Sequence, residues 1–399
     1  MYSLYFHIPF CVHRCAYCDF NTYAGQESLI PAYVESLCRE VEIVAHSGPE
    51  RLQAHTIFFG GGTPSLLSPK QFESILKSVR DSFDLYPQAE ISLEANPGTV
   101  TLDSLRDLRG LGFNRISLGV QSAHPDELRQ LERIHGYFDV IEAVTWARHA
   151  GFDNLNLDLI FGLPEQSLER WQATVKLILG LRPEHLSLYA LTVEHGTPFG
   201  RWEQRGLLPV PDPDAAADMY EWVGETLEAA GFEQYEISNW AKPGRQCRHN
   251  LQYWRGQPYL GFGAGAHGFS SGLRVANVLR IKTYIERLQN EQNLSKSSFP
   301  LSPATVNQTR ISRRVEMQET MMTGMRLTRE GVSAEGFARR FGIQMWDVFG
   351  KEIDELVGLG LLEWVGDDPC EGSQHSQGLL RLTKHGRLLG NQVFMRFVD

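Results

Sequence analysis

The sequence predicts an α/β fold: a partial (β/α)6 barrel, similar to a TIM barrel, followed by a smaller C-terminal part. Over roughly the first 195 residues, short runs rich in β-branched and aromatic residues alternate with longer amphipathic segments. Polar residues gather where the expected strands end. With 42% hydrophobic and 22% charged residues, the chain of 399 residues has ordinary globular composition and length for two or three domains.

The alternation defines the expected elements one by one. Strands are expected at residues 4–8, 56–59, 90–94, 115–120, 154–161 and 185–191. Helices are expected between them, at residues 31–45, 69–83, 102–111, 139–150 and 168–179. Gly112, Gly151 and Gly180 stand where the C-caps of three of these helices would fall.

In barrels of this kind, the working residues lie at the C-terminal ends of the strands and in the loops that follow. All six expected strands end near polar or cysteine residues: the cysteine-rich loop, Gly60–Pro64, Glu94 with Asn96, Gln121 with Ser122, Asp158, and Thr192. A single polar residue at a strand end often only caps the next helix. Six at one rim predict a common site.

Three of the six cysteines fall within eight residues, Cys11, Cys15 and Cys18, at the spacing C-x3-C-x2-C. A structural zinc site takes four protein ligands, whereas three thiolates on a cubane iron–sulfur cluster leave one iron open. Zinc with His7 or His13 as fourth ligand, and chance packing of core cysteines, are the alternatives. The isolated Cys38 and Cys370 are expected to be inert, and Cys247 to be dispensable for a cluster.

This cysteine motif, with Tyr17 before its last cysteine, resembles that of the radical S-adenosylmethionine (SAM) superfamily. Further runs resemble one branch of it, which contains the oxygen-independent coproporphyrinogen III dehydrogenases and the HemW-type heme chaperones: residues 6–11, 61–65, 117–122 and 156–164. The resemblance extends over nearly the whole chain. It implies a 4Fe–4S cluster whose open iron is chelated by the amino and carboxylate groups of SAM, and electron transfer that yields a 5′-deoxyadenosyl radical.

The resemblance also implies which residues contact SAM: Tyr5, Tyr17, Gly61, Gly62, Thr63, Glu94, Gln121, Arg133 and Asp158. Glycines let a backbone approach a ligand closely, and an arginine can pair with a carboxylate through two hydrogen bonds. The glycine run is no phosphate loop, because no Lys-Ser/Thr pair follows it. A plain tight turn, and structural ion pairs or caps for the polar residues, remain the alternatives.

A second cluster of chemistry-bearing residues follows the barrel. His249 and Tyr253 are four residues apart and would share one face of a helix. A neutral imidazole can ligate iron, although a histidine packed beside aromatic residues explains the pattern equally well by itself. His-Asn-x-x-Tyr-Trp resembles the signature of the heme chaperones, which implies heme binding by His249, Tyr253 and Trp254. Cys247 and His267 are candidates for a second heme ligand.

The resemblance divides the chain into residues 1–300, a radical SAM barrel with an extension that carries the heme motif, and residues 301–399, a small winged-helix-like domain. In the latter, helices are expected at 312–326, 333–341 and 346–359, and strands at 360–365 and 378–383. Winged helices often bind DNA. However, basic and acidic residues nearly balance over residues 305–399, and the whole chain carries a net charge of −10. We therefore expect a lid or docking element and no nucleic acid partner.

Three functions follow as hypotheses. The first is a cytoplasmic heme chaperone that delivers heme to acceptor proteins such as respiratory cytochromes at the membrane surface. The first strand begins almost at Met1, whereas the dehydrogenases carry several dozen residues before the cysteine loop. The second is a coproporphyrinogen III dehydrogenase of porphyrin biosynthesis, and the third a DNA-binding iron–sulfur sensor. No signal peptide or membrane-spanning run is expected; productive SAM cleavage and a homodimer stay open.

Overall fold

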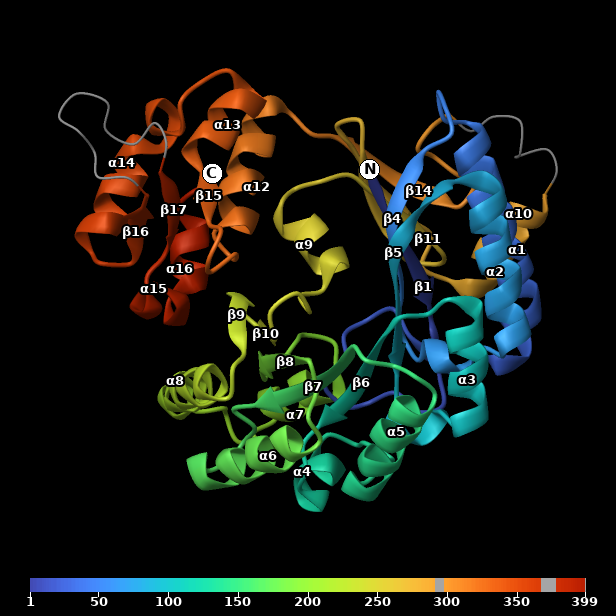
Figure 1. Cartoon of the computed structure of the whole chain (residues 1–399), viewed down its shortest axis with the longest axis horizontal. Coiled ribbons are helices and arrows are strands. Elements are labelled where there is room, and N and C mark those ends of the chain that lie inside the picture. Colours follow the sequence, from blue (N-terminus) through green and yellow to red (C-terminus); the bar gives the residue numbers. More distant parts are fainter. Residues whose placement is uncertain (291–297, 367–377, 399) are drawn as a thin grey trace. The chain divides into compact units, whose positions relative to one another are not determined.

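The computed structural model describes residues 1–290, 298–366 and 378–398 (Figure 1). The chain forms two compact units. The first contains Met1–Thr226 and Pro258–Thr309, and the second contains Leu227–Gln257 and Arg310–Asp399. The domain boundary expected near residue 300 stays a prediction. Cys370 lies outside the described residues.

Six parallel strands form the centre of the first unit, in the order in which the sequence predicts them. They are β1 (Tyr2–Ile8), β4 (Gln53–Gly61), β5 (Asp84–Ala95), β6 (Arg115–Gln121), β7 (Leu155–Phe161) and β8 (His185–Ala190). Each strand pairs with the next one along the chain. The predicted partial (β/α)6 barrel is confirmed.

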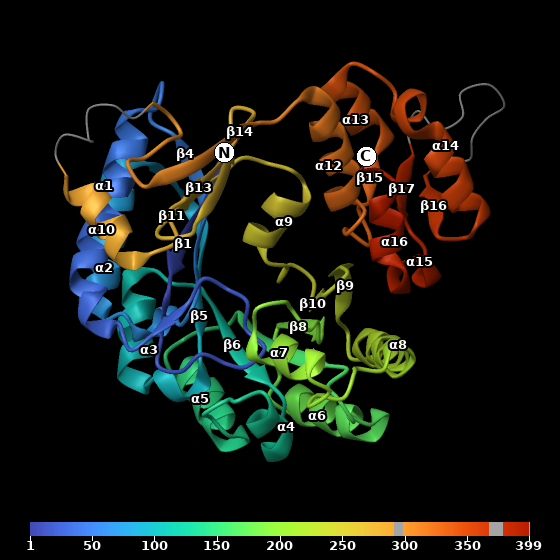
Figure 2. The same cartoon turned by 180° about the vertical axis from the view of Figure 1, so that it is seen from behind.

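The connecting helices lie on the outer side of these strands (Figures 1 and 2). They are α1 (Ile30–His46), α2 (Pro69–Ser82), α3 (Leu102–Leu111), α5 (Tyr137–His149) and α6 (Leu168–Gly180), with the short α4 (Pro125–Gln130) before α5. Gly112 closes α3 in the left-handed conformation, as predicted. Gly180 does not act as a cap: it is the last residue of α6, and the positive φ falls on Arg182 instead.

Four further strands extend the sheet beyond β1, and the sequence did not predict them. β11 (Tyr259–Phe262) pairs in parallel with β1, and β12 (His267–Ser270), β13 (Leu273–Asn277) and β14 (Thr305–Arg310) follow in order. Figure 2 shows β11 and β13 beside β1. Here a glycine serves close packing: a Cβ on Gly261 would collide with the backbone of His267. α7 (Pro198–Gln204), α8 (Pro213–Ala229) and α10 (Ile281–Gln289) complete the helices around this sheet.

The core of the sheet is aromatic. The ring centroids of Phe6 and Phe59 lie 4.9 Å apart, those of Phe6 and Phe262 lie 5.2 Å apart, and all three side chains are buried. Alternate residues of β1, β4 and β11 thus meet on one face of the sheet, because side chains on a strand point to opposite sides in turn. This packing fixes the strand from which the cysteine loop leaves.

The second unit contains a hairpin of β9 (Glu233–Glu236) and β10 (Asn239–Ala241), then α9 (Arg248–Trp254). After residue 310 come α12 (Arg313–Gly324), α13 (Ala334–Phe341), α14 (Met345–Gly358), α15 (Lys384–Leu388) and α16 (Gly390–Met395). A small sheet has the order β15 (Val332–Ser333), β17 (Leu379–Leu382), β16 (Leu362–Val365). The three helices and two strands expected for a winged-helix-like domain are confirmed. No helix in the described ranges is long and apolar enough to cross a membrane.

Candidate functional site

The cysteine loop starts in a short paired strand, and the backbone after this strand is less regular. Cys11 lies in β2 (Phe10–Cys11), which pairs in parallel with β3 (Tyr23–Ala24). Past Cys11, the amide of Cys18 donates to the carbonyl of Cys15 at 3.2 Å. The Ala16 carbonyl accepts from the amide of Phe199 at 3.0 Å. The loop therefore holds its three thiols on a scaffold of backbone hydrogen bonds.

All three cysteines open into one cavity of about 500 Å³ at the C-terminal ends of the strands. Residues from every predicted strand end line it: Gly61, Gly62, Thr63, Glu94, Asn96, Gln121, Asp158 and Thr192, together with Tyr17 and Arg133. The predicted convergence of the six strand ends is confirmed. Tyr5 is the exception among the residues expected to contact SAM. It does not line the cavity; its hydroxyl lies 3.0 Å from Nδ1 of His7 and its ring stacks on Phe58.

The chemistry of these donors fits an iron–sulfur cluster. Cys11, Cys15 and Cys18 are free thiols that face the same space. Burial raises the pKa of Cys11 and of Cys18, so a metal centre that takes them as thiolates displaces their protons. In the described part of the chain, no three histidine, cysteine or acidic side chains lie close enough to share a single metal ion.

His7 is engaged elsewhere, which argues against it as a zinc ligand. Its Nε2 lies 2.9 Å from the carbonyl oxygen of Asn21 and its Nδ1 lies 3.0 Å from the hydroxyl of Tyr5. Both ring nitrogens would have to leave these partners to reach a metal. The other histidine considered, His13, is exposed and pairs with Glu132 at 3.6 Å.

The glycine turn after β4 packs against the cysteine loop. A Cβ on Gly61 would lie 2.5 Å from the ring of His7, and one on Gly62 would lie 2.6 Å from the carbonyl of Phe10. The amides of Gly62 and Thr63 donate to the carbonyls of Ile8 and Phe10, at 2.9 and 2.8 Å. Packing within the chain therefore requires both glycines. This agrees with the tight turn, which the sequence left open as an alternative.

Two carboxylates stand in the cavity wall. Oε2 of Glu94 accepts from the amide of Gly61 at 3.0 Å. Burial and the nearby charge of Asp158 raise the pKa of Glu94 to about 7. Burial also raises the pKa of Asp158, whose carboxylate accepts from Ser117 at 2.9 Å and Asn156 at 2.7 Å. A cationic ligand between these groups would favour their ionised forms.

The sequence analysis missed Ser117 and Asn156. Ser117 lies on β6 directly across from Asn156 on β7, and Asn156 lies two residues before Asp158. Residues i and i+2 of a strand point to the same face, so the spacing Asn-x-Asp was a usable signal. Since Asp158 was expected at the site, the same spacing places Asn156 on the inner face of β7.

Arg133 reaches the cavity from the end of α4. Its amide donates to the carbonyl of Leu128 at 2.8 Å, and its side chain donates to Cys15, Asn96 and the Gly119 carbonyl. Glu132, just before it, has a φ of +54°, which turns the chain sharply. The position of Arg133 therefore depends on how α4 is held.

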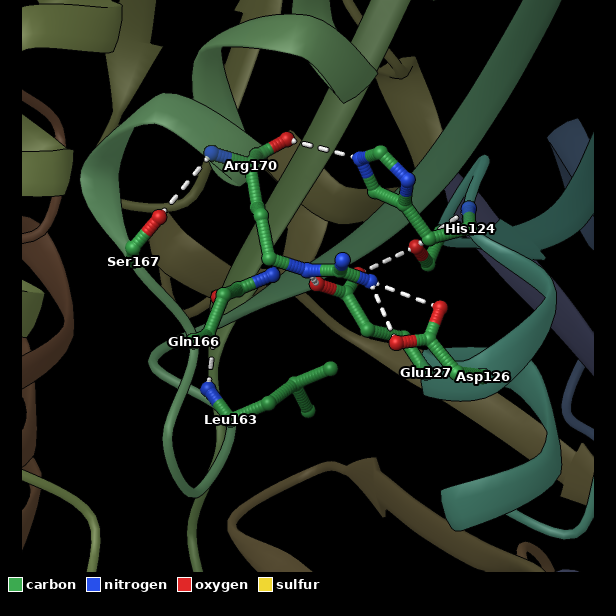
Figure 3. A network of polar contacts seen from close by, with 8 residues as sticks. His124, Asp126, Glu127, Leu163, Gln166, Ser167 and Arg170 are labelled. Atoms are coloured by element: carbon green, nitrogen blue, oxygen red, sulfur yellow. Dashed lines mark hydrogen bonds and ion pairs between the residues drawn. The ribbon is translucent and has the colours of Figure 1, made fainter.

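Figure 3 shows the polar network that holds α4. The guanidinium of Arg170 donates to both oxygens of Asp126 at 2.7 Å and to Glu127 at 3.0 Å, while the Arg170 carbonyl lies 3.1 Å from Nε2 of His124. Glu127 is buried, and its second oxygen accepts from Ser122. A charge buried in this way needs its cationic partner.

The substitution Arg170→Met is expected to lower the free energy of unfolding by about 1–3 kcal/mol, because Glu127 would lose its cation while only partly reached by water. Urea unfolding at neutral pH measures the change. Lys77→Met provides the control: Lys77 pairs with Asp81 on the exposed face of α2 and should change stability by less than about 0.5 kcal/mol. Equal effects of the two substitutions would contradict a structural role for the network.

The residues expected to bind heme lie on α9 in the second unit. His249 is 1% exposed, its Nε2 lies 2.8 Å from the hydroxyl of Tyr253, and the two rings meet edge to face. The predicted sharing of one helical face is confirmed. Trp254 is the last residue of α9, and the guanidinium of Arg326 lies 4.5 Å above its ring. Cys247 is buried at the start of α9, and His267 is exposed on β12.

Comparisons with known proteins agree with this architecture. The sequence profile of the radical SAM superfamily matches residues 5–178, and that of the HemN C-terminal domain matches residues 311–367. The chain is 38% identical to the heme chaperone HemW of Bacillus subtilis, over 100% of this chain and 99% of that protein. It is 37% identical to the heme chaperone HemW of Escherichia coli, over 99% and 98%.

A solved structure supports the fold independently. The coproporphyrinogen III oxidase HemN from Escherichia coli, described as a radical SAM enzyme, matches with a TM-score of 0.80 at 24% identity, over 99% of this chain and 89% of that one. The likeness at this identity concerns the fold alone. The near full-length matches at 37–38% identity show that the chain belongs to the HemW family of the radical SAM superfamily.

Proposed function

We propose that the chain is a heme chaperone which holds a 4Fe–4S cluster on Cys11, Cys15 and Cys18, binds SAM in the same cavity, and binds heme through α9. The near full-length similarity to heme chaperones carries the proposal. Its acceptors would be heme proteins such as respiratory cytochromes, met in the cytoplasm or at the membrane surface. The proposal is compatible with a homodimer but does not require one.

The cavity chemistry supports SAM as a ligand. SAM carries a sulfonium, an ammonium and a carboxylate, and the cavity offers Glu94 and Asp158 for the positive groups and Arg133 for the carboxylate. An ammonium group has only hydrogen-bond donors, so it would use carbonyl oxygens of this turn together with Glu94. The amides of Gly61, Gly62 and Thr63 already donate to acceptors within the chain. Gln121 can hydrogen-bond a ribose hydroxyl. When bound, the cluster and SAM supply one-electron chemistry; the chain positions them and limits access of water.

Heme binding at α9 has a structural requirement. Nε2 of His249 is bonded to Tyr253 and the ring is buried, so ligation through this nitrogen needs the hydrogen bond to be released. Tyr253 and Trp254 would then offer aromatic surface to the macrocycle. A heme site of this kind would be formed on binding.

An anaerobic heme titration tests the proposal. Wild-type protein is expected to bind heme with a histidine-ligated absorption spectrum, and His249→Ala to lose at least about tenfold in affinity, because one iron ligand is missing. His46→Ala, an exposed histidine at the end of α1, is the matched control and should bind like wild type. Identical titrations for all three proteins would remove His249 from the site.

The same preparation, reconstituted with iron and sulfide, can be assayed for conversion of coproporphyrinogen III to protoporphyrinogen. Turnover would favour a dehydrogenase over a chaperone. The fold likeness to HemN does not by itself favour that activity.

A further inference from the structure

A chain of hydrogen bonds crosses the cavity wall from one cluster cysteine to another. Thr63 Oγ1 donates to Sγ of Cys11 at 3.6 Å, and Nδ2 of Asn96 donates to Thr63 Oγ1 at 3.0 Å. On the other side, Nη2 of Arg133 donates to Oδ1 of Asn96 at 2.5 Å, while Nη1 donates to Sγ of Cys15 at 3.5 Å. Asn96 stands in the middle of this chain.

The direction of every bond follows from Arg133. A guanidinium has only donors, so the atom of Asn96 that faces it is the amide oxygen. The NH₂ group of Asn96 must then face Thr63, whose hydroxyl oxygen accepts from it. The single hydrogen of Thr63 is thereby directed at Cys11. Both ends of the chain consequently donate to sulfur.

The backbone of Asn96 is held in place. Asn96 directly follows β5 and precedes the turn Pro97–Thr99, in which Pro97 is buried. Its carbonyl accepts from the amide and the hydroxyl of Thr99, at 3.0 and 2.8 Å. Because this turn is held in place, the Asn96 side chain keeps its orientation. A fixed orientation is needed if Asn96 is to determine the direction of the neighbouring hydrogen bonds.

We infer that Asn96 is a positioning residue which directs the hydrogen bonds of Thr63 and Arg133 to the cluster thiolates and thereby raises the reduction potential of the cluster. Donors to the sulfurs stabilise the additional negative charge of the reduced cluster. The inference rests on the proposed function, because it assumes a cluster on Cys11, Cys15 and Cys18.

The substitution Asn96→Asp changes the hydrogen-bond chain at its Thr63 end and leaves the Arg133 end unchanged. An ionised aspartate keeps the acceptor for Arg133 but has no donor for Thr63. The Thr63 hydroxyl would turn toward the new carboxylate, and Cys11 would lose its hydrogen bond. The lost hydrogen bond to Cys11 and the added negative charge of the aspartate both lower the reduction potential of the cluster. We expect the ratio of reduced to oxidised cluster at a fixed applied potential to fall about tenfold, which for a one-electron couple is a shift of about 59 mV to more negative potential.

The test is a redox titration of the reconstituted full-length protein without SAM, with dithionite as the electron donor and the paramagnetic signal of the reduced cluster as the readout. Thr63→Val, which removes only the donor to Cys11, should also lower the potential, and Thr63→Ser should restore it. Gln88→Glu adds the same charge to β5 at an exposed position and should titrate like wild type.

The outcomes are distinguishable. If Asn96→Asp or Thr63→Val holds a cluster that titrates at the wild-type potential, the inference is overturned. If Asn96→Asp fails to assemble a cluster, Thr63→Val still decides the question. If the wild-type protein assembles no cluster under the same conditions, the proposed function fails first, and this inference fails with it.

Discussion

Replacing Cys11, Cys15 or Cys18 by alanine, one at a time, is expected to abolish a stable 4Fe–4S cluster. Each thiolate would hold one iron, and the fourth iron is left to SAM in the proposed function, so the loss of one thiolate leaves two irons without a protein ligand. Iron content and visible absorbance after anaerobic reconstitution measure the effect. We expect both to fall to the background of the untreated protein.

The remaining described cysteines provide the controls. Cys38 lies on α1 away from the cavity, and Cys247 is buried in the second unit. Cys38→Ala and Cys247→Ala should retain the iron content of wild type. Thermal unfolding of the apo-proteins shows whether a loss of cluster is a loss of fold. Normal iron content and absorbance in any of the three cavity variants would contradict the assignment.

The centre of the fold could be predicted because local pattern and long-range packing agree there. The strands β1 and β4 to β8 are apolar runs separated by amphipathic segments, and parallel pairing in chain order requires no further information. The strands β11 to β14 could not be predicted in this way. They are short, and they owe their position to β1, from which they are separated by most of the barrel sequence.

The candidate site likewise has features that could be predicted from the sequence and features that could not. Strand ends gave Glu94, Gln121 and Asp158 because a parallel barrel brings all such ends to one rim. The hydrogen bonds between Thr63, Asn96 and Arg133 could not be predicted, because they depend on side-chain direction and on the turn after α4. Most residues of the cavity wall were therefore predictable from the sequence, whereas the hydrogen bonds between them were not.

The glycine turn shows how one composition permits two explanations. A run of glycines indicates that something approaches the backbone closely, and a ligand and another chain segment leave the same signal. In the structure, His7 and the carbonyl of Phe10 occupy that space. Substitution of Gly61 or Gly62 would displace the cysteine loop whatever ligand the cavity holds.

The largest expected loss of stability comes from a residue that does not line the cysteine cavity. Glu40 on α1 is 1% exposed, and burial raises its pKa. Its carboxylate accepts four hydrogen bonds: from the amide of Gly263 and the hydroxyl of Tyr284 on one oxygen, and from Asn277 and Ser302 on the other, at 2.6 to 2.8 Å. This group joins α1 to β13, α10 and the segments around them.

Glu40→Ala is expected to lower the free energy of unfolding by about 3–5 kcal/mol, because buried donors would lose their acceptor and a cavity would replace the side chain. Urea unfolding measures it. Glu40→Gln should cost less, since the hydroxyls of Ser302 and Tyr284 can rotate to accept a hydrogen bond whereas the amide of Gly263 cannot. Glu35→Ala, on the exposed side of α1, is the control and should stay within about 0.5 kcal/mol of wild type. An Ala variant at position 40 no less stable than this control would show that β13 and α10 are held to α1 by apolar packing alone.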